Sequence, residues 1–473
     1  MAKIPSDRFN SNPGSKHAPG YSLRIFSKKT PFLDFFTSSE DTIFGSAGQN
    51  EILESIRQKI TTVEYEDNEI LYDQLKITFR GSLLDSTGVQ VPVPEFIMRE
   101  DLFEEGTIIS LKGGYGTSFN SIGAAEVIKR EFNYSDDPSC TVIAYEPLHR
   151  MAQESEENLR IYTGLRAAQI VQNIGRRAAY NGPFGALFTV HKINPLLPIF
   201  TRRAERQKAG ESDYQFVDRM ARVRGWDFFT RFDDKTNKFD LQFGPNLDDK
   251  DAKYRYEYGS LGEYRPLVFQ EDRLLNFTPM INVIDQNTSI NIVSMNPKEK
   301  KKIESGNVFN EKTGAFDNAE DLAEKKRDPS KYRADLFGES KVIVANKPFK
   351  NEAEVKKFVV RWAREKIKNF ITGSGRVMGN EFLQTRTNQE FGGLGISFSG
   401  TFTNPATWYL TKVKHIFSSS SGLTYETSFD ARRAIDWIPG DIFGSELIVN
   451  LHEAEKKKKT TQFNIITASF EEL

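Results

Sequence analysis

The sequence has little cysteine and little histidine. Its 473 residues include one cysteine, Cys140, which cannot form an intrachain disulfide and has no neighbouring base to activate its thiol. We therefore expect Cys140 to be a buried strand residue. The five histidines are His17, His149, His191, His415 and His452. None of them pairs at the short spacings of metal sites, so we predict no metal site and no cofactor, and we interpret His415 as a packed strand residue.

The sequence also lacks an excess of charge of one sign and lacks long apolar runs. It has 64 Lys and Arg against 65 Asp and Glu, a net charge of −1. A protein whose main partner is a nucleic-acid backbone usually carries a basic excess, because it must neutralise phosphates. The N-terminus has no apolar signal region, and no window approaches the apolar length of a membrane helix. We expect a protein made in the cytosol, without membrane insertion.

No catalytic motif stands out. The glycine-rich runs at 113–116 and 392–395 have neither the GxxxxGK[ST] pattern nor a GxGxxG between a strand and a helix. We interpret both as turns and bulges of β-rich segments. The acidic residues lie mainly in expected loops and charged faces, and spacing alone cannot reveal a glycosidase pair. We therefore predict no catalytic, cofactor-binding or metal-binding residues and a protein that is not an enzyme.

Aromatic residues are plentiful, with 37 phenylalanines, which favours β-rich packing. Residues 1–20 are turn formers and predict a flexible arm. Residues 21–145 predict a first β-rich domain of short strands. In it Leu75, Ile77 and Phe79 alternate with polar residues, and 107–111 and 141–145 are further strands.

Residues 146–295 predict a mixed α+β middle domain. The apolar spacing predicts a helix over 163–180, with Thr163 as its cap. A second helix over 213–224 begins with a capping box of Ser212 and Gln215 and ends at Gly225. The pattern over 226–243 predicts a β-hairpin with its turn at 233–237. Further strands are expected near 254–258, 264–269 and 279–293.

The remainder of the chain begins with a charged segment. Residues 296–340 predict a linker or long loop, because they are rich in charge and poor in periodic apolar residues. Residues 341–440 predict a second β-rich domain that contains a helix over 352–371, glycine-rich strands over 391–402, and strands over 408–417 and 424–433. The extension 441–473 carries the lysine run 456–459, either a solvated tail or a contact for DNA or an acidic partner. The fold class is α+β and β-rich.

The order of these segments resembles the baseplate hub family of contractile tails, which includes the late control gene D proteins of phages and the N-terminal part of VgrG spikes. The segment E-P-L-H-R at 146–150 is similar to the family's D-P-L-H-R, with Glu146 in place of aspartate. The segment 212–221, followed by 226–229, looks like the family's S-D-x-x-F-L-x-R-L-A and G-x-x-F. The residues His415, Tyr425, Thr427, Phe429 and Arg432 resemble the family's late strand pair, with the tyrosine displaced by two positions from its usual place after Gly422. The resemblance covers roughly 70–435.

The resemblance implies two tail-tube-like β-barrel domains flanking the middle domain. Three chains would form a pseudo-sixfold ring that adapts a hexameric tail tube to a trimeric spike and leaves a central channel for DNA or the tape-measure protein. The implied partners are a second and third copy of the chain, the tube, spike and baseplate wedge proteins, and the tape-measure protein or DNA. The implied location is the tail baseplate of a virion, assembled in the host cytoplasm. The chain ends soon after the second β-rich section, so we expect the spike on another chain.

Two alternatives stay open: a tail-associated cell-wall hydrolase, and a receptor-binding or adhesin module of the same particle.

Overall fold

The computed structural model describes the following residues: 19–26, 33–38, 56, 58–84, 89–99, 103–115, 118–153, 159–182, 185–190, 205–224, 226–245, 254–258, 273–282, 289–295, 302–305, 341–345, 371–392, 406–419 and 422–433. The β-rich α+β fold expected from the sequence is confirmed.

The N-terminal strands form one part of a 13-stranded sheet, in the order β2-β1-β7-β8-β9-β4-β3. They are β1 (Pro19–Phe26), β2 (Leu33–Ser38), β3 (Ile60–Asn68), β4 (Gln74–Arg80), β7 (Ile108–Tyr115), β8 (Ser118–Asn133) and β9 (Ser139–Tyr145). All their pairings are antiparallel. The predicted alternation in β4 is confirmed, since Leu75, Ile77 and Phe79 are fully buried. Hydrophobic alternation thus decides which face of these strands lines the core.

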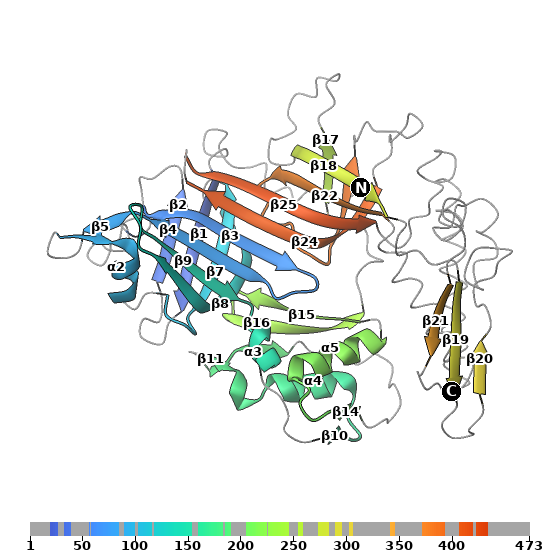
Figure 1. The fold of residues 1–473 in the computed structure, drawn as a ribbon. Coiled ribbons are helices and arrows are strands. Elements are labelled where there is room, and N and C mark those ends of the chain that lie inside the picture. The colour runs from blue at the N-terminus through green and yellow to red at the C-terminus, as the bar shows by residue number, and fades with distance from the viewer. Residues whose placement is uncertain are drawn as a thin grey trace.

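The C-terminal strands form a part of the sheet that closes on itself. They are β17 (Tyr254–Tyr258), β18 (Arg273–Ile281), β22 (Ile371–Met378), β23 (Asn388–Gly392), β24 (Ala406–Ser418) and β25 (Thr424–Arg433). They pair in the order β24-β23-β17-β18-β22-β25, and β25 returns to β24. Strand β24 also pairs with β3 over residues 412–418, so a single strand belongs to both parts of the sheet (Figure 1).

The first hydrophobic core lies inside the N-terminal part of the sheet and also receives side chains from β24 and β25. Phe417 stacks on Tyr425 with ring centroids 4.1 Å apart. A Cβ on Gly113 would lie 2.5 Å from Phe417, so the glycine-rich run in β7 lets the two parts of the sheet approach. The bulge expected at this run lies in the opposite strand instead: the register shift between Leu111 and Lys112 leaves Ile122 of β8 as the extra residue, and residues 113–115 pair in regular register.

A second layer packs on the end of the sheet. It contains α3 (Leu148–Gln153), α4 (Ala167–Gly175), α5 (Asp213–Arg224) and the hairpin of β15 (Trp226–Asp233) and β16 (Lys238–Pro245). Figure 1 shows this hairpin between the main sheet and the helices. The shared core includes Phe26 and Ile108 of the sheet together with Phe216 and Val217 of α5. Smaller elements complete the described chain: β5 (Ser82–Leu84), β6 (Gln90–Pro92), α2 (Val93–Arg99), β10 (Arg160–Tyr162), η2 (Ala178–Tyr180), β11 (Asn181–Gly182), β12 (Gly185–Ala186), β13 (Phe188–Val190) and β14 (Glu205–Gln207).

The helix predictions have different outcomes. Helix α5 is confirmed with its capping box, since the Gln215 N–H donates to Ser212 Oγ over 3.1 Å and the Ser212 N–H donates to Gln215 Oε1 over 3.1 Å. The helix expected over 163–180 is wrong in its bounds, because α4 begins after Arg166 and ends at Gly175. Gly164, with φ of +70°, keeps the chain out of the helical conformation near Thr163.

Several predicted boundaries also change. Residues 19 and 20 belong to β1 rather than to an arm, because they pair with 114 and 115 of β7. Part of the expected linker, β20 (Lys302–Ser305), pairs with β19 (Ser289–Met295), which pairs in turn with β21 (Lys341–Ala345). Strands β17 and β18, which we assigned to the middle domain, pair with the C-terminal strands instead. Strand β22 already begins at residue 371, and residues 264–269, 352–370 and 441–473 lie outside the described residues.

Candidate functional site

Three acidic side chains form a row at one end of the main sheet. Asp67 is in β3, Asp73 directly precedes β4 and Glu146 directly follows β9. The strand registers place Asp67 opposite Asp73, and Asp73 opposite Glu146. The Glu146 N–H donates to the carbonyl of Asp73 over 2.8 Å. All three are 2–5% exposed. A buried row of carboxyl groups needs compensating partners.

Two arginines from other parts of the chain face this row. The Arg231 Nη1 of β15 donates to Asp67 Oδ2 over 2.9 Å, and its Nη2 donates to the Thr385 carbonyl over 2.8 Å. The Arg386 Nη1 lies 3.8 Å from Asp67 Oδ1. Both guanidinium groups lie over the Phe229 ring, at 5.2 and 4.3 Å from its centroid. A single carboxylate thus connects β3, β15 and the segment before β23.

Thr385, Tyr65 and Thr230 complete the set. The Thr385 N–H donates to Asp67 Oδ2 over 2.9 Å, and its hydroxyl donates to Asp67 Oδ1. The Tyr65 hydroxyl donates to Asp73 Oδ2 over 3.0 Å. The Thr230 N–H donates to Glu146 Oε1 over 3.0 Å, and its hydroxyl donates to the same oxygen. We call this set the buried joint, with these members: Tyr65, Asp67, Asp73, Glu146, Thr230, Arg231, Thr385 and Arg386.

The carboxyl groups of the buried joint differ in acidity. Burial raises the pKa of Asp67, but the charges of Arg231 and Arg386 outweigh it and lower that pKa to about 2. Burial raises the pKa of Asp73 well above its usual value, and the charges of Asp67 and Glu146 raise it further. Burial also raises the pKa of Glu146, although the bond from Thr230 opposes this. The joint therefore favours an ionised Asp67 and opposes ionisation of the other two.

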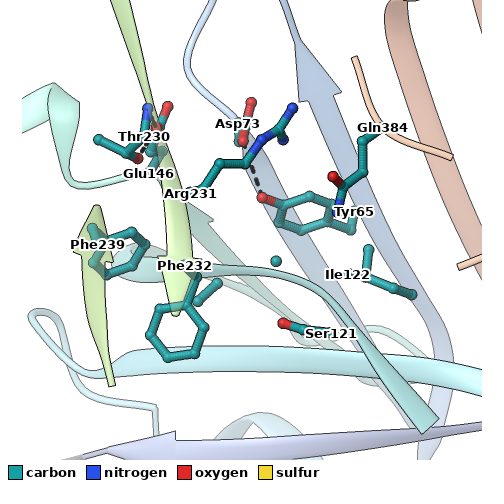
Figure 2. A pocket seen from close by; sticks show the side chains of 12 residues that line it. Tyr65, Asp73, Ser121, Ile122, Glu146, Thr230, Arg231, Phe232, Phe239 and Gln384 are labelled. Atoms are coloured by element: carbon teal, nitrogen blue, oxygen red, sulfur yellow. Dashed lines mark hydrogen bonds between the residues drawn. The ribbon is translucent and has the colours of Figure 1, made fainter. Parts of the chain in front are cut away.

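A cavity of about 270 Å³ borders the buried joint (Figure 2). Tyr65, Asp73, Glu146 and Arg231 contribute to its wall. A Cβ on Gly123 would lie 2.1 Å from the Tyr65 hydroxyl, so glycine is needed there for Tyr65 to reach Asp73. The polar wall makes this cavity suitable for water.

The chemistry of the joint is that of a connector. A glycosidase pair must present two carboxyl groups to a substrate cleft. Here Asp73 and Glu146 are each 5% exposed and accept bonds from the protein. Among the described residues, no group of three or more His, Cys, Asp or Glu side chains could hold a metal ion. No helix among these residues is long and apolar enough to cross a membrane.

Of the three acidic residues, only Glu146 stood out in the sequence, through the family resemblance; Asp67 and Asp73 were missed. A signal was present for Asp67. In β3, Val63, Tyr65 and Asp67 occupy alternate positions, so Asp67 shares the buried face with two core residues. An acidic residue at an inward position indicates a buried partner of opposite charge.

The other motif residues also make buried structural contacts. Asp213, which is 0% exposed, accepts a bond from Gln207 Nε2 over 2.9 Å and further bonds from Arg177 and Tyr180. Arg150 donates from Nε to Glu126 Oε2 over 2.7 Å and from Nη1 to the Asn181 carbonyl over 2.9 Å. These contacts tie the helical layer together and to the sheet.

The motif residues of the late strand pair, β24 and β25, also make structural contacts within the protein. His415 is 1% exposed, which confirms it as a packed residue. Its Nε2 lies 3.1 Å from the Leu383 carbonyl, which can only accept, so Nδ1 accepts from the Tyr425 hydroxyl at 2.9 Å. Arg432 makes a bidentate pair with Glu69 at 2.7 and 3.0 Å. Cys140 is buried as expected, and burial raises the pKa of its thiol to about 12.

The solvent-facing side of the main sheet is mainly polar, with Met280 of β18 among its exposed apolar residues. We call it the polar face: the solvent side of the strand run β18, β22, β25, β24, β3, β4, β9 and β8, in which each strand is antiparallel to the next. Its charges pair across strands. Three of the pairs are Lys412–Glu66 at 2.9 Å, Lys414–Glu64 at 2.9 Å and Arg376–Glu426 at 3.3 Å. A hollow of about 370 Å³ lies in this face over β18, β22, β25 and β24.

Comparisons with known proteins give a fold but no sequence family. The chain matches no protein-family model, and it matches none of the curated proteins. Solved structures do match. The tail protein from Neisseria meningitidis MC58 aligns with a TM-score of 0.54 and 9% identity, over 88% of this chain and 97% of that chain. The 43 kDa tail protein of prophage MuSo2 from Shewanella oneidensis aligns with a TM-score of 0.53 and 9% identity, over 88% and 99%.

A chain of the half-lidded Francisella PdpA–VgrG complex aligns with a TM-score of 0.51 and 8% identity, over 92% of this chain and 61% of that chain. At these identities the likeness concerns the fold alone. The chain therefore has a fold found in phage tail proteins and in a VgrG complex.

Proposed function

We propose that this chain is a structural baseplate hub of a contractile tail or a related injection system. Three copies form a ring that adapts a hexameric tail tube to a trimeric spike around a central channel. The observation that carries the proposal is strand β24, which joins two β-rich parts of one chain into a single sheet with a continuous polar face. The fold likeness to phage tail proteins supports it.

The two tube-like domains of this proposal correspond to the two parts of the sheet. The first contains β1 to β4 and β7 to β9, and the second contains β17, β18 and β22 to β25. Two similar units in each of three chains would present six units to a sixfold tube, while the chain itself keeps threefold symmetry. A ring of this kind needs head-to-tail contacts that close after a full turn.

The ends of the polar face suit such contacts. Within the described residues, 128–133 of β8 pair only with β9, and 275–281 of β18 pair only with β22. The run has an even number of alternating strands, so β18 of one copy would meet β8 of the next in antiparallel orientation. Lys129 and Pro279 lie on these two end strands. Such residues oppose uncontrolled edge pairing, which suits an edge reserved for one partner.

The polar face is the surface we assign to the channel. Its cross-strand ion pairs leave it with both signs interspersed. A surface of this kind does not concentrate positive charge against phosphates, so DNA or an extended polypeptide could pass without tight binding.

The first test is assembly. We expect the purified chain to sediment as a trimer, alone or with its tube and spike partners, and to enter assembled baseplates. A chain that stays monomeric and never enters a particle would refute the hub. A peptidoglycan zymogram and a cell-binding assay address the hydrolase and adhesin alternatives, and we expect both to be negative.

The second test maps the ring contact. Because Cys140 is buried, engineered cysteines can be oxidised selectively. Cysteine at Thr278 of β18, combined in turn with cysteine at Lys129, Glu131 or Asn133 of β8, should give covalent trimers for one member of the series. The matched control pairs cysteine at Thr278 with cysteine at Arg80, which is exposed but lies on an interior strand of the run, and should give none.

A further inference from the structure

The buried joint carries more carboxyl groups than cationic groups. Asp67, Asp73 and Glu146 face two guanidinium groups, Arg231 and Arg386. The other titratable groups in and around the joint are Tyr65 of β3, Tyr72 before β4, Tyr214, Asp218 and Arg222 of α5, and His415 of β24. Arg222 pairs with Asp218 at 2.7 Å, and buried His415 accepts a hydrogen bond at Nδ1 and is neutral, so this set adds no net positive charge. Full ionisation would leave one uncompensated negative charge in a buried place, which is costly.

The hydrogen bonds of the three carboxyl groups indicate which of them share the uncompensated negative charge. Asp67 accepts bonds from Arg231 and from the N–H and hydroxyl of Thr385, so its ionised form is fully partnered. Asp73 and Glu146 have neutral partners only: Tyr65 and the Asn68 N–H for Asp73, and Thr230 for Glu146.

Asp73 and Glu146 also face each other across neighbouring strands, joined by a 2.8 Å backbone bond. Two carboxylates placed opposite each other in this way repel, and one of them keeps its proton. The cavity beside the pair provides space for water through which that proton can exchange.

We propose that the Asp73–Glu146 pair holds one proton at neutral pH, and that this proton keeps the hairpin layer attached to the main sheet. The attachment runs through Thr230 and Arg231, neighbouring residues of β15. When the pair ionises fully at alkaline pH, the cost of the extra buried charge and the repulsion between the carboxylates favour opening of the joint to water, which separates the hairpin layer from the sheet. The joint is thus a pH-sensitive connection between the sheet and the hairpin layer, independent of the ring.

The direction of the pH effect follows from the acidity of the pair. Burial raises the pKa of both carboxyl groups in the folded protein. A carboxyl group whose pKa is higher in the folded than in the unfolded protein contributes stability that is fully present below its pKa in the unfolded protein. This stability is lost as pH rises through its pKa in the folded protein. We therefore expect the alkaline limb of the stability profile to depend on Asp73 and Glu146.

Infrared spectroscopy tests the proton directly in the wild-type protein. A carbonyl stretching band of a protonated carboxylic acid should be present at neutral pH and should disappear at alkaline pH. Isotopic labelling of aspartate or of glutamate carboxyl groups should shift this band. The band should be lost or displaced in Asp73→Asn or Glu146→Gln and unchanged in the matched control Glu64→Gln, whose side chain lies on the polar face.

Thermal unfolding gives the second readout. The unfolding temperature of the wild type should fall from neutral to alkaline pH, and Asp73→Asn should remove most of this fall. Absence of the infrared band from the wild type at neutral pH would overturn the proposal, whatever the variants do. If the band is absent and potassium also stabilises the protein relative to tetramethylammonium at equal ionic strength, a bound cation rather than a proton offsets the excess charge.

Discussion

Replacing Asp67 by asparagine tests whether the buried joint holds distant parts of the chain together. The carboxylate binds Arg231 and Thr385, which lie 164 and 318 positions away in the sequence. The charges of the arginines overcome burial and lower its pKa from 3.8 to about 2. At 1.36 kcal/mol per pKa unit, this shift corresponds to roughly 2 kcal/mol of stability.

The asparagine variant also leaves Arg231 without its anionic partner. Removing one member of a buried ion pair costs about 3–5 kcal/mol. Asparagine keeps the shape and one acceptor oxygen, so we expect a loss of about 3 kcal/mol, between these two figures. Equilibrium unfolding in urea at neutral pH measures it from the midpoint and slope.

The neighbouring residue provides the control. Glu66 lies on the polar face and pairs with Lys412, and both side chains are partly exposed. Glu66→Gln should cost less than about 1 kcal/mol, as exposed ion pairs do. Arg231→Met supplies a double-mutant cycle, in which the combined loss should be about 2 kcal/mol smaller than the sum of the two single losses. A loss below about 1 kcal/mol for Asp67→Asn, or strict additivity with Arg231→Met, would refute the idea that this contact connects the layers.

Further outcomes are expected at three other positions. Burial lowers the pKa of His415 from 6.5 to about 4, so its neutral form contributes about 3 kcal/mol of stability above pH 6.5, which is lost as pH falls toward 4. In urea unfolding, His415→Gln should reduce this loss of stability at acid pH. An unchanged loss would contradict the view that His415 is buried in its neutral form. Gly379→Ala should lower the unfolding temperature strongly, because its Cβ would lie 2.1 Å from the Tyr425 ring, whereas the control Gly244→Ala, with nothing within 4 Å, should leave it unchanged; equal effects would refute the packing argument. In calorimetric unfolding, Ser212→Ala should cost about 1 kcal/mol through loss of the helix cap, and Ser212→Asn should restore most of this stability.

The sequence by itself determined the local elements. Alternation of apolar and polar residues was sufficient for β4, β24 and β25, because a half-buried strand exposes every second side chain. The capping box of Ser212 and Gln215 was sufficient for the start of α5, because both of its bonds are local. The absence of paired histidines and of phosphate-loop motifs led to the prediction that the protein is not an enzyme, and this stays a prediction.

Only the tertiary structure decided how these elements join. The pairing of β24 with β3 brings together strands about 350 positions apart, and no local pattern encodes which strand edge meets which. The same holds for the buried joint: alternation along β3 places Asp67 on the inward face, but nothing in the sequence identifies Arg231 and Thr385 as its partners. A buried ion pair is defined by exclusion of water from all sides, and that exclusion exists only once the sheet, the hairpin layer and the segment before β23 have packed together.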